Sequence, residues 1–144
     1  SLGSTDNLQA FSGYRNQRSE LLAMGLEIFE YRQDPAVRTT VMQRYIALRE
    51  QSPVFALHAK TMVIDAEKVY VGTFNLDPRS ENLNTEVGVV IHDSSQARLV
   101  AESIATDMLP TNSWRAAEDV DRYAPWSKRL RVAFWQWLPI KPLL

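Results

Sequence analysis

His58 and Lys60 stand two residues apart in a stretch with a strand-like pattern, and both side chains can carry positive charge. Residues two apart in a strand point to the same face of the sheet, so this imidazole and ammonium group would lie side by side. Two potential cations on an otherwise apolar strand cost desolvation energy unless an anion meets them. The pair therefore indicates an anionic substrate.

Further hydrogen-bond donors follow at Gly72, Thr73 and Asn75. Glycine lets another group approach the backbone closely, and a hydroxyl, a backbone N–H and a side-chain amide can all donate to an oxyanion. Together with His58 and Lys60 they describe a site that suits a phosphate group. The competing interpretation is a purely structural histidine in a hairpin, which is the commoner role of a single histidine in a strand.

The spacing of these residues resembles a known motif. The pattern His58-x-Lys60-x4-Asp65-x6-Gly72-Thr73-x-Asn75 is similar, position by position, to the HKD motif of the phospholipase D superfamily, with Thr73 where that family usually has serine. The stretch "NLDPRSENLNTEVGVVI" after the motif, and "SLGSTD" and "LPIKPLL" at the two ends, resemble the bacterial cardiolipin synthase branch. The resemblance covers nearly the whole chain.

This resemblance implies a fold and a reaction. The fold would be α/β, an α-β-α sandwich with a mixed central sheet that forms one lobe of a bilobal or dimeric enzyme. The reaction would be phosphatidyl transfer between phospholipids, through a covalent phosphohistidine intermediate and without a metal or other cofactor. The alternatives are a phospholipase D hydrolase, a phosphodiesterase or nuclease of the same superfamily, and a non-catalytic partner lobe.

The resemblance also implies roles for single residues. The expected catalytic set is His58, Lys60, Asn75, Glu86 and Asp65. Lys60 and Asn75, assisted by Thr73, would hold the phosphate oxygens. Glu86 would orient the imidazole and stabilise its charged form. Asp65 falls on the opposite face of the strand from His58, so we expect it to support the site rather than to act in it.

Transfer by this route needs two histidines, one as nucleophile and one as general acid and base. The other histidine of the chain, His92, has neither the lysine nor the downstream motif, so we expect it to be a strand-end residue. The second motif would come from an N-terminal HKD half of the same enzyme or from a homodimer mate. Which of the two roles belongs to His58 stays open at this point.

Helices and strands alternate around these residues. We expect helices over 7–24, 36–50 and 95–108, the first capped within 4–6 and ended by Gly25 in a left-handed conformation. Strands are expected over 26–32, 54–65, 68–74 and 85–91. The second and third form a hairpin around Ala66 and Glu67, and the apolar run of the fourth predicts a central strand covered on both faces. Residues 110–128 are expected to form a loop or extended tail.

The predicted organisation is a catalytic half-domain over 1–109, with its motif at 58–75, and an aromatic and basic extension over 110–144. From Arg122 to Leu144 the chain has five basic and no acidic residues, interleaved with aromatic ones. Such a segment suits an anionic membrane surface, where aromatic rings lie at headgroup level and basic side chains meet phosphate. Alternatively its tryptophans pack back on the domain, and both can hold.

Composition limits the function classes. A chain of 144 residues with 45 % hydrophobic residues is the size of one domain with a real core. The net charge of −1 provides no broad basic field, so no nucleic-acid partner is expected. The absence of cysteine excludes disulfides, thiolate metal sites and cysteine nucleophiles. The resemblance to the cardiolipin synthase branch implies a phospholipid substrate and a peripheral place at the bacterial cytoplasmic membrane.

Overall fold

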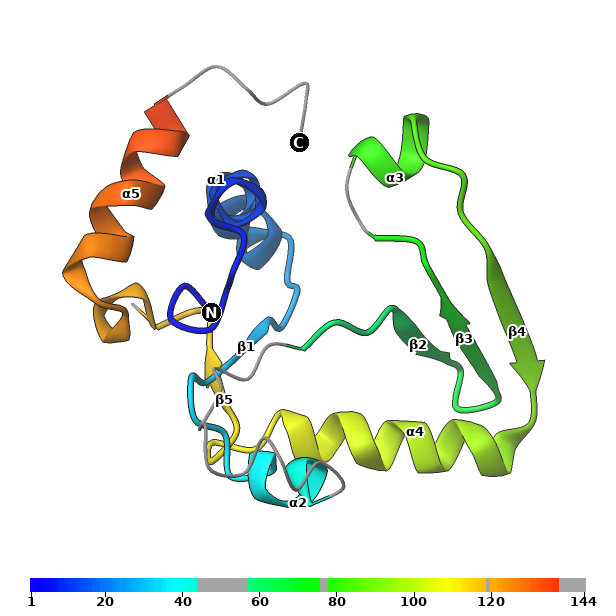
Figure 1. Cartoon of the computed structure of the whole chain (residues 1–144). Coiled ribbons are helices and arrows are strands. Elements are labelled where there is room, and N and C mark those ends of the chain that lie inside the picture. The colour runs from blue at the N-terminus through cyan, green and yellow to red at the C-terminus, as the bar shows by residue number, and fades with distance from the viewer. Residues whose placement is uncertain (44–56, 76–77, 119, 138–144) are drawn as a thin grey trace. The chain divides into compact units, whose positions relative to one another are not determined.

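The computed structural model describes residues 1–43, 57–75, 78–118 and 120–137. The chain divides into two compact units (Figure 1). The first contains Ser1–Leu57 and Asp107–Ile140, and the second contains His58–Thr106. Helices and strands occur in both units, which confirms the predicted α/β class. Among the described residues, no helix combines the length and the apolar character that crossing a bilayer requires.

The first unit begins with α1 (Leu8–Ala23), close to the predicted 7–24. Its cap is Asn7, whose side chain accepts a hydrogen bond from Ala10 N, so the cap lies just after the predicted 4–6. Gly25 follows the helix with a φ of 93°, as predicted, because glycine enters the left-handed region without a steric penalty.

Residues 110–128 do not form the predicted loop. They contain β5 (Ser113–Arg115), the 3-10 helix η2 (Val120–Tyr123) and the start of α5 (Trp126–Trp137). The strand β5 pairs antiparallel with β1 (Phe29–Tyr31). This pairing joins segments more than 80 residues apart, which local sequence patterns cannot reveal, and that is why the prediction was wrong.

The core of the first unit lies between α1 and α5, and Figure 1 shows α1 nearly end-on next to α5. It consists of Leu2, Leu8, Phe11, Ala124 and Val132, with Tyr14 and Trp135 packed against it. On the β1–β5 sheet, the Trp114 ring stacks on Tyr123 with centroids 4.1 Å apart, and the Arg32 guanidinium covers the Trp114 ring. Trp114 thus contacts both Tyr123 and Arg32. The helix predicted over 36–50 is described only as α2 (Arg38–Met42), and residues 44–50 lie outside the described part.

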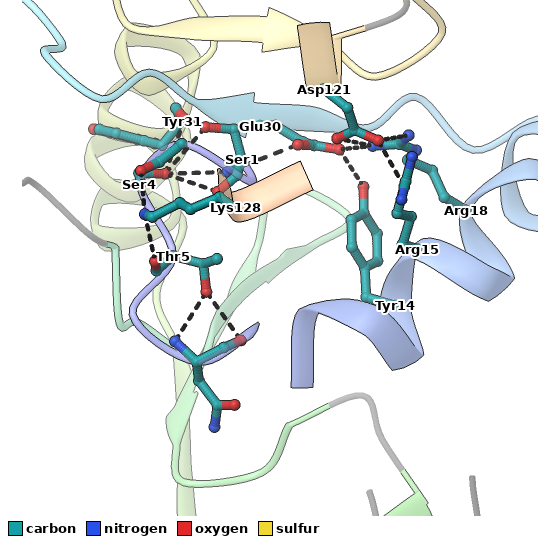
Figure 2. Close-up of polar contacts among 12 residues, drawn as sticks. Ser1, Ser4, Thr5, Tyr14, Arg15, Arg18, Glu30, Tyr31, Asp121 and Lys128 are labelled. Atoms are coloured by element: carbon teal, nitrogen blue, oxygen red, sulfur yellow. Dashed lines mark hydrogen bonds and ion pairs between the residues drawn. The ribbon is translucent and has the colours of Figure 1, made fainter. Parts of the chain in front are cut away.

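A buried ion network ties α1 to β1 and η2 (Figure 2). Arg18 contacts Glu30 and Asp121, each at 2.8 Å, and Arg15 also contacts Asp121 at 2.8 Å. Tyr14 donates a hydrogen bond to Glu30. Because buried charges are costly unless each finds a partner, the network holds these three segments in one arrangement.

The second unit contains a three-stranded antiparallel sheet in the order β2-β3-β4, formed by Thr61–Ile64, Lys68–Gly72 and Gly88–His92. The β2–β3 hairpin was predicted, but its turn is centred one residue earlier than expected, on Asp65 and Ala66. These residues have φ values of 52° and 54°, and Glu67 N donates to Ile64 O across the turn. Positive φ at both central positions is what a type I′ turn needs.

Two helices follow strands in this unit: α3 (Pro78–Asn82) after β3, and α4 (Ser94–Asp107) after β4. The α4 prediction is confirmed, and its N-terminus is capped by Asp93, which accepts hydrogen bonds from Ser95 N and Gln96 N. Hydrogen bonds from these two residues lower the pKa of the Asp93 carboxyl.

The strand β4 corrects one expectation. It pairs with β3 alone within the described part of the chain, and all five of its residues are exposed. It is therefore an edge strand here rather than a central strand covered on both faces. A continuous apolar run indicates that a strand suits burial, but it does not say which residues supply the cover.

Candidate active site

His58 and Lys60 lie in the extended segment that leads into β2. Gly72 N donates to Lys60 O at 3.0 Å, so this segment continues the pairing of β2 with β3. The two side chains meet as the spacing predicts: Lys60 Nζ lies 2.5 Å from His58 Nε2. An ammonium group is a donor only, so a charged Lys60 side chain donates to His58 Nε2 in this contact.

Glu86 lies just before β4 and is held by Thr73, which follows β3. Thr73 Oγ1 donates to Glu86 Oε2 at 2.5 Å and accepts from Val87 N at 3.0 Å. Hydrogen bonds from Thr73 first, and then from Ser80 and Asn84, lower the pKa of the Glu86 carboxyl, and the charge of Lys60 acts in the same direction. Glu86 is therefore an anion at neutral pH.

Asn75 reaches the same region through a short connection. Its backbone N donates to Ser80 Oγ at 3.3 Å, and Ser80 belongs to α3. Pro78 at the first position of α3 suits a helix start, because the missing N–H would have no partner there. The hydrogen bonds of Ser80 thus link Asn75 to Glu86.

These side chains border one open pocket of about 820 Å³. The volume falls in the range of ligand-binding sites, and all of its lining belongs to the second unit. The lining residues are His58, Ala59, Lys60, Thr61, Val71, Gly72, Thr73, Asn75, Asn84, Thr85, Glu86 and Val87. Five of the six candidate residues from the sequence are therefore brought together: His58, Lys60, Thr73, Asn75 and Glu86.

Asp65 and His92 lie away from this pocket. Asp65 occupies the turn at the other end of β2 from His58, and its positive φ is a conformation that aspartate tolerates better than most residues. His92 ends β4 and pairs in register with Lys68, near the same turn. The structure thus gives Asp65 a place in the hairpin and His92 a place at a strand end.

Two local contacts differ from the arrangement expected for the site. In the described residues no hydrogen bond joins Glu86 to His58; the carboxylate is held by Thr73 instead. The Thr73 backbone N donates to Val87 O, and the Gly72 N donates to Lys60 O, so both backbone donors serve the sheet. Gly72 and Gly88 make room for the Tyr70 ring, which a Cβ at either position would overlap.

Sequence reasoning missed Ser80, Asn84 and Tyr70. Ser80 and Asn84 support Glu86, and Tyr70 covers the two glycines beside the pocket. A signal for the first two was present, because "PRSENLN" places polar residues in the short connection between Asn75 and Glu86. Tyr70 had no such signal, since its position over Gly88 depends on the pairing of β3 with β4.

The pocket combines an imidazole, an ammonium group, an amide and a carboxylate. An unprotonated ring nitrogen can act as nucleophile or general base, and an ammonium group beside it can bind an anionic oxygen. This set suits an attack on a phosphorus centre with stabilisation of its oxygens.

Comparisons with known proteins agree with this chemistry. A family model described as "Cardiolipin synthase, PLD-like domain" matches residues 6–108. Cardiolipin synthase C of Escherichia coli K12 is 33 % identical over 94 % of this chain and 30 % of its own length. An uncharacterized protein of Helicobacter pylori 26695 is 36 % identical over 72 % of this chain and 19 % of its own. The major cardiolipin synthase ClsA of Bacillus subtilis 168 is 38 % identical over 46 % of this chain and 14 % of its own.

The chain therefore spans less than a third of the length of these curated relatives. No solved structure gave a significant match.

Proposed function

The chain belongs to the family of phospholipase D-like cardiolipin synthase domains, and from this membership we propose that it is one catalytic half of a phosphatidyltransferase. Its substrates would be phospholipids, and a phosphatidyl group would move from one lipid to a hydroxyl of another. The observation that carries the proposal is the contact of Lys60 Nζ with His58 Nε2 in a pocket that also contains Asn75 and Glu86.

The proposed reaction has two steps. In the first, a histidine nitrogen attacks phosphorus, a P–N bond forms, and the P–O bond to the leaving alcohol breaks as a second histidine protonates that oxygen. In the second, the acceptor hydroxyl gives its proton to that second histidine and attacks phosphorus, and the P–N bond breaks. His58 takes one of these two roles, and the other histidine belongs to a second motif outside this chain.

The remaining side chains have distinct proposed tasks. Lys60 and Asn75 bind the non-bridging phosphate oxygens, so charge that develops on them meets fixed donors. Glu86, kept ionised by its hydrogen-bond partners, is the proposed carboxylate that stabilises the imidazolium form of His58. Thr73 and Ser80 keep that carboxylate at the pocket, and Asp65 supports the hairpin that carries His58.

The second motif would be supplied by an N-terminal HKD half of the same enzyme or by a homodimer mate. Because the substrate is a membrane lipid, the enzyme would work at the surface of an anionic membrane, peripherally on the bacterial cytoplasmic side. These proposals about partner and location rest on the family and on the chemistry of the substrate.

The test is product analysis with phosphatidylglycerol vesicles over a range of chain concentrations. We expect cardiolipin and free glycerol, with a specific activity that rises with concentration if two copies complete the site. If the N-terminal half completes it, the activity appears only when that half is present.

Phosphatidic acid as the product would indicate a hydrolase instead of the proposed transferase. Cleavage of DNA without lipid turnover would indicate a nuclease instead. No turnover under any of these conditions would support a non-catalytic lobe.

A further inference from the structure

One face of the helix α5 packs against the rest of the first unit. Val132 is fully buried, and Trp135 packs on the core between α1 and α5. Lys128 donates hydrogen bonds to Gly3 O at 2.7 Å and to Thr5 O at 3.0 Å, and Figure 2 shows its side chain reaching this N-terminal segment. Gln136 bonds to side chains of α1. The inner face of α5 is thus occupied by contacts within the first unit.

The opposite face is apolar and open to solvent. Trp126, Leu130, Phe134 and Trp137 are 73 %, 61 %, 56 % and 81 % exposed. They are spaced four, four and three residues apart, so they share one side of the helix, and we call them the outer stripe of α5. Single exposed apolar residues are ordinary, but three large aromatic rings aligned along one helix indicate a surface that meets something apolar.

Basic side chains flank the outer stripe on both sides. Arg129 lies one helical turn after Trp126, and Arg131 lies one helical turn before Phe134 on the other side of the helix. Both arginines are exposed. No acidic residue follows Asp121 in the chain, whereas the net charge of the whole chain is −1. The two residues that flank the apolar stripe on α5 are therefore both positively charged, with no acidic residue of α5 beside them.

We propose that the outer stripe of α5 docks on the surface of an anionic phospholipid bilayer. Tryptophan and phenylalanine rings partition to the boundary between headgroups and acyl chains, and arginines beside them meet lipid phosphates. Pairing with a second copy is disfavoured by charge, because stripe-to-stripe contact would bring the arginines of both copies together. The inference rests on the proposed function for its lipid substrate and adds the surface that brings the enzyme to it.

The test is co-sedimentation of the chain with vesicles of phosphatidylcholine, with and without phosphatidylglycerol. We expect binding that needs phosphatidylglycerol, and Trp126→Ser with Trp137→Ser should weaken it about tenfold or more. The matched control is Met24→Ser with Leu26→Ser, two apolar residues of the same unit that are 70 % and 47 % exposed; it should change binding less than twofold. Arg129→Gln with Arg131→Gln should remove the preference for phosphatidylglycerol.

Circular dichroism identifies any variant that has lost its helix, and Phe134→Ser then serves as the milder stripe variant. Unchanged binding by a folded stripe variant would overturn the proposal, as would a stripe variant that alters only the oligomeric state. The His58→Ala variant should bind vesicles normally. For the unsubstituted chain with its completing half present, normal vesicle binding without lipid turnover would therefore count against the proposed function alone. Turnover with binding that does not depend on the stripe would count against this docking surface alone.

Discussion

Two side chains in the pocket act on each other before any substrate binds. Lys60 Nζ lies within hydrogen-bond distance of His58 Nε2, so the ammonium group and the imidazole are paired with each other. A phosphate oxygen would attract the ammonium group more strongly than the imidazole does, so substrate binding would release Nε2 for its task. The contact therefore represents a resting arrangement of the proposed site.

His58→Ala should abolish lipid turnover, with a loss of at least about a thousandfold, because no other group in the pocket can replace the imidazole. The chain offers a matched control in His92→Ala, since His92 is exposed at a strand end away from the pocket. Initial rates with phosphatidylglycerol vesicles measure both. Equal losses in the two variants would remove His58 from the mechanism.

Glu86→Gln should lower kcat by about a hundredfold with little change in KM, because the carboxylate stabilises charge that appears on the imidazole during the reaction. Glu67→Gln, at an exposed position in the hairpin turn, is the matched control. Turnover by Glu86→Gln at the normal rate would assign the imidazole partner to another residue.

Thr73 can be tested through the titration of Glu86. Its hydrogen bond is the largest of the causes that lower the pKa of this carboxyl, so Thr73→Val should raise the pKa toward its usual value. Thr73→Ser keeps the hydroxyl and should leave the pKa unchanged. Carboxyl NMR of the two variants distinguishes them, and the same titration curve for both would show that Thr73 does not hold Glu86.

At the scale of elements, the hairpin of β2 and β3 sets the spacing of the site. Its turn forces positive φ on Asp65 and on Ala66, and the left-handed region costs a non-glycine residue roughly 1 to 2 kcal/mol. The hairpin nevertheless aligns Lys60 with Gly72, and thereby brings His58 near Thr73 and Asn75. Strain in the turn is thus offset by the pairing on either side of it.

Ala66→Gly should stabilise the second unit by about 0.5 to 1 kcal/mol, since glycine enters this φ range freely but gains entropy in the unfolded chain. Ala66→Val should destabilise it by a similar amount or more, because a branched side chain fits the left-handed region poorly. Thermal unfolding followed by far-ultraviolet circular dichroism measures both changes. Destabilisation by glycine would contradict the turn geometry.

At the scale of the whole molecule, the two units have different kinds of support. The first unit has a buried core and an ion network that joins α1, β1 and η2. In the second unit, exposed apolar residues occur on all three strands of the sheet, including Met62, Val71 and Val89. A large exposed apolar area on a sheet is typical of a surface that binds a partner, which agrees with the proposed second half.

The ion network predicts a pH dependence of stability. Burial would raise the pKa of Asp121, but hydrogen bonds and charge from Arg18 and Arg15 outweigh it and lower the pKa overall. A carboxyl with a lowered folded pKa contributes its full stability above its unfolded pKa, near 3.9, and loses it as the pH falls through the folded value. Asp121 should therefore stabilise the first unit at pH 7 and lose this effect in acid.

Asp121→Asn should destabilise the first unit by about 3 kcal/mol at pH 7, with the deficit shrinking below about pH 4. Glu20→Gln, at an exposed position of α1, is the control and should change stability little at either pH. Near-ultraviolet circular dichroism of the stacked Trp114 and Tyr123 reports unfolding of this unit. A deficit that stays constant with pH would contradict the role of the ionised carboxylate.

Sequence alone was sufficient for features that depend on neighbours along the chain. The alternation of a strand predicted the contact of His58 with Lys60, a glycine predicted the end of α1, and the helix expected over 95–108 is α4. Of the motif residues, His58, Lys60, Thr73 and Asn75 border one pocket, because a hairpin forms by a short connection, whereas Asp65 lies in the turn of that hairpin.

Only the tertiary structure decided the features that join distant segments. These are the pairing of β1 with β5, the ion pairs of Arg18 with Glu30 and Asp121, and the two faces of α5. It also showed that Thr73 donates a hydrogen bond to Glu86. The physical reason is the same in each case. Such contacts depend on which surfaces pack together, and a periodic pattern of side chains indicates that a surface suits burial but does not identify the segment that covers it.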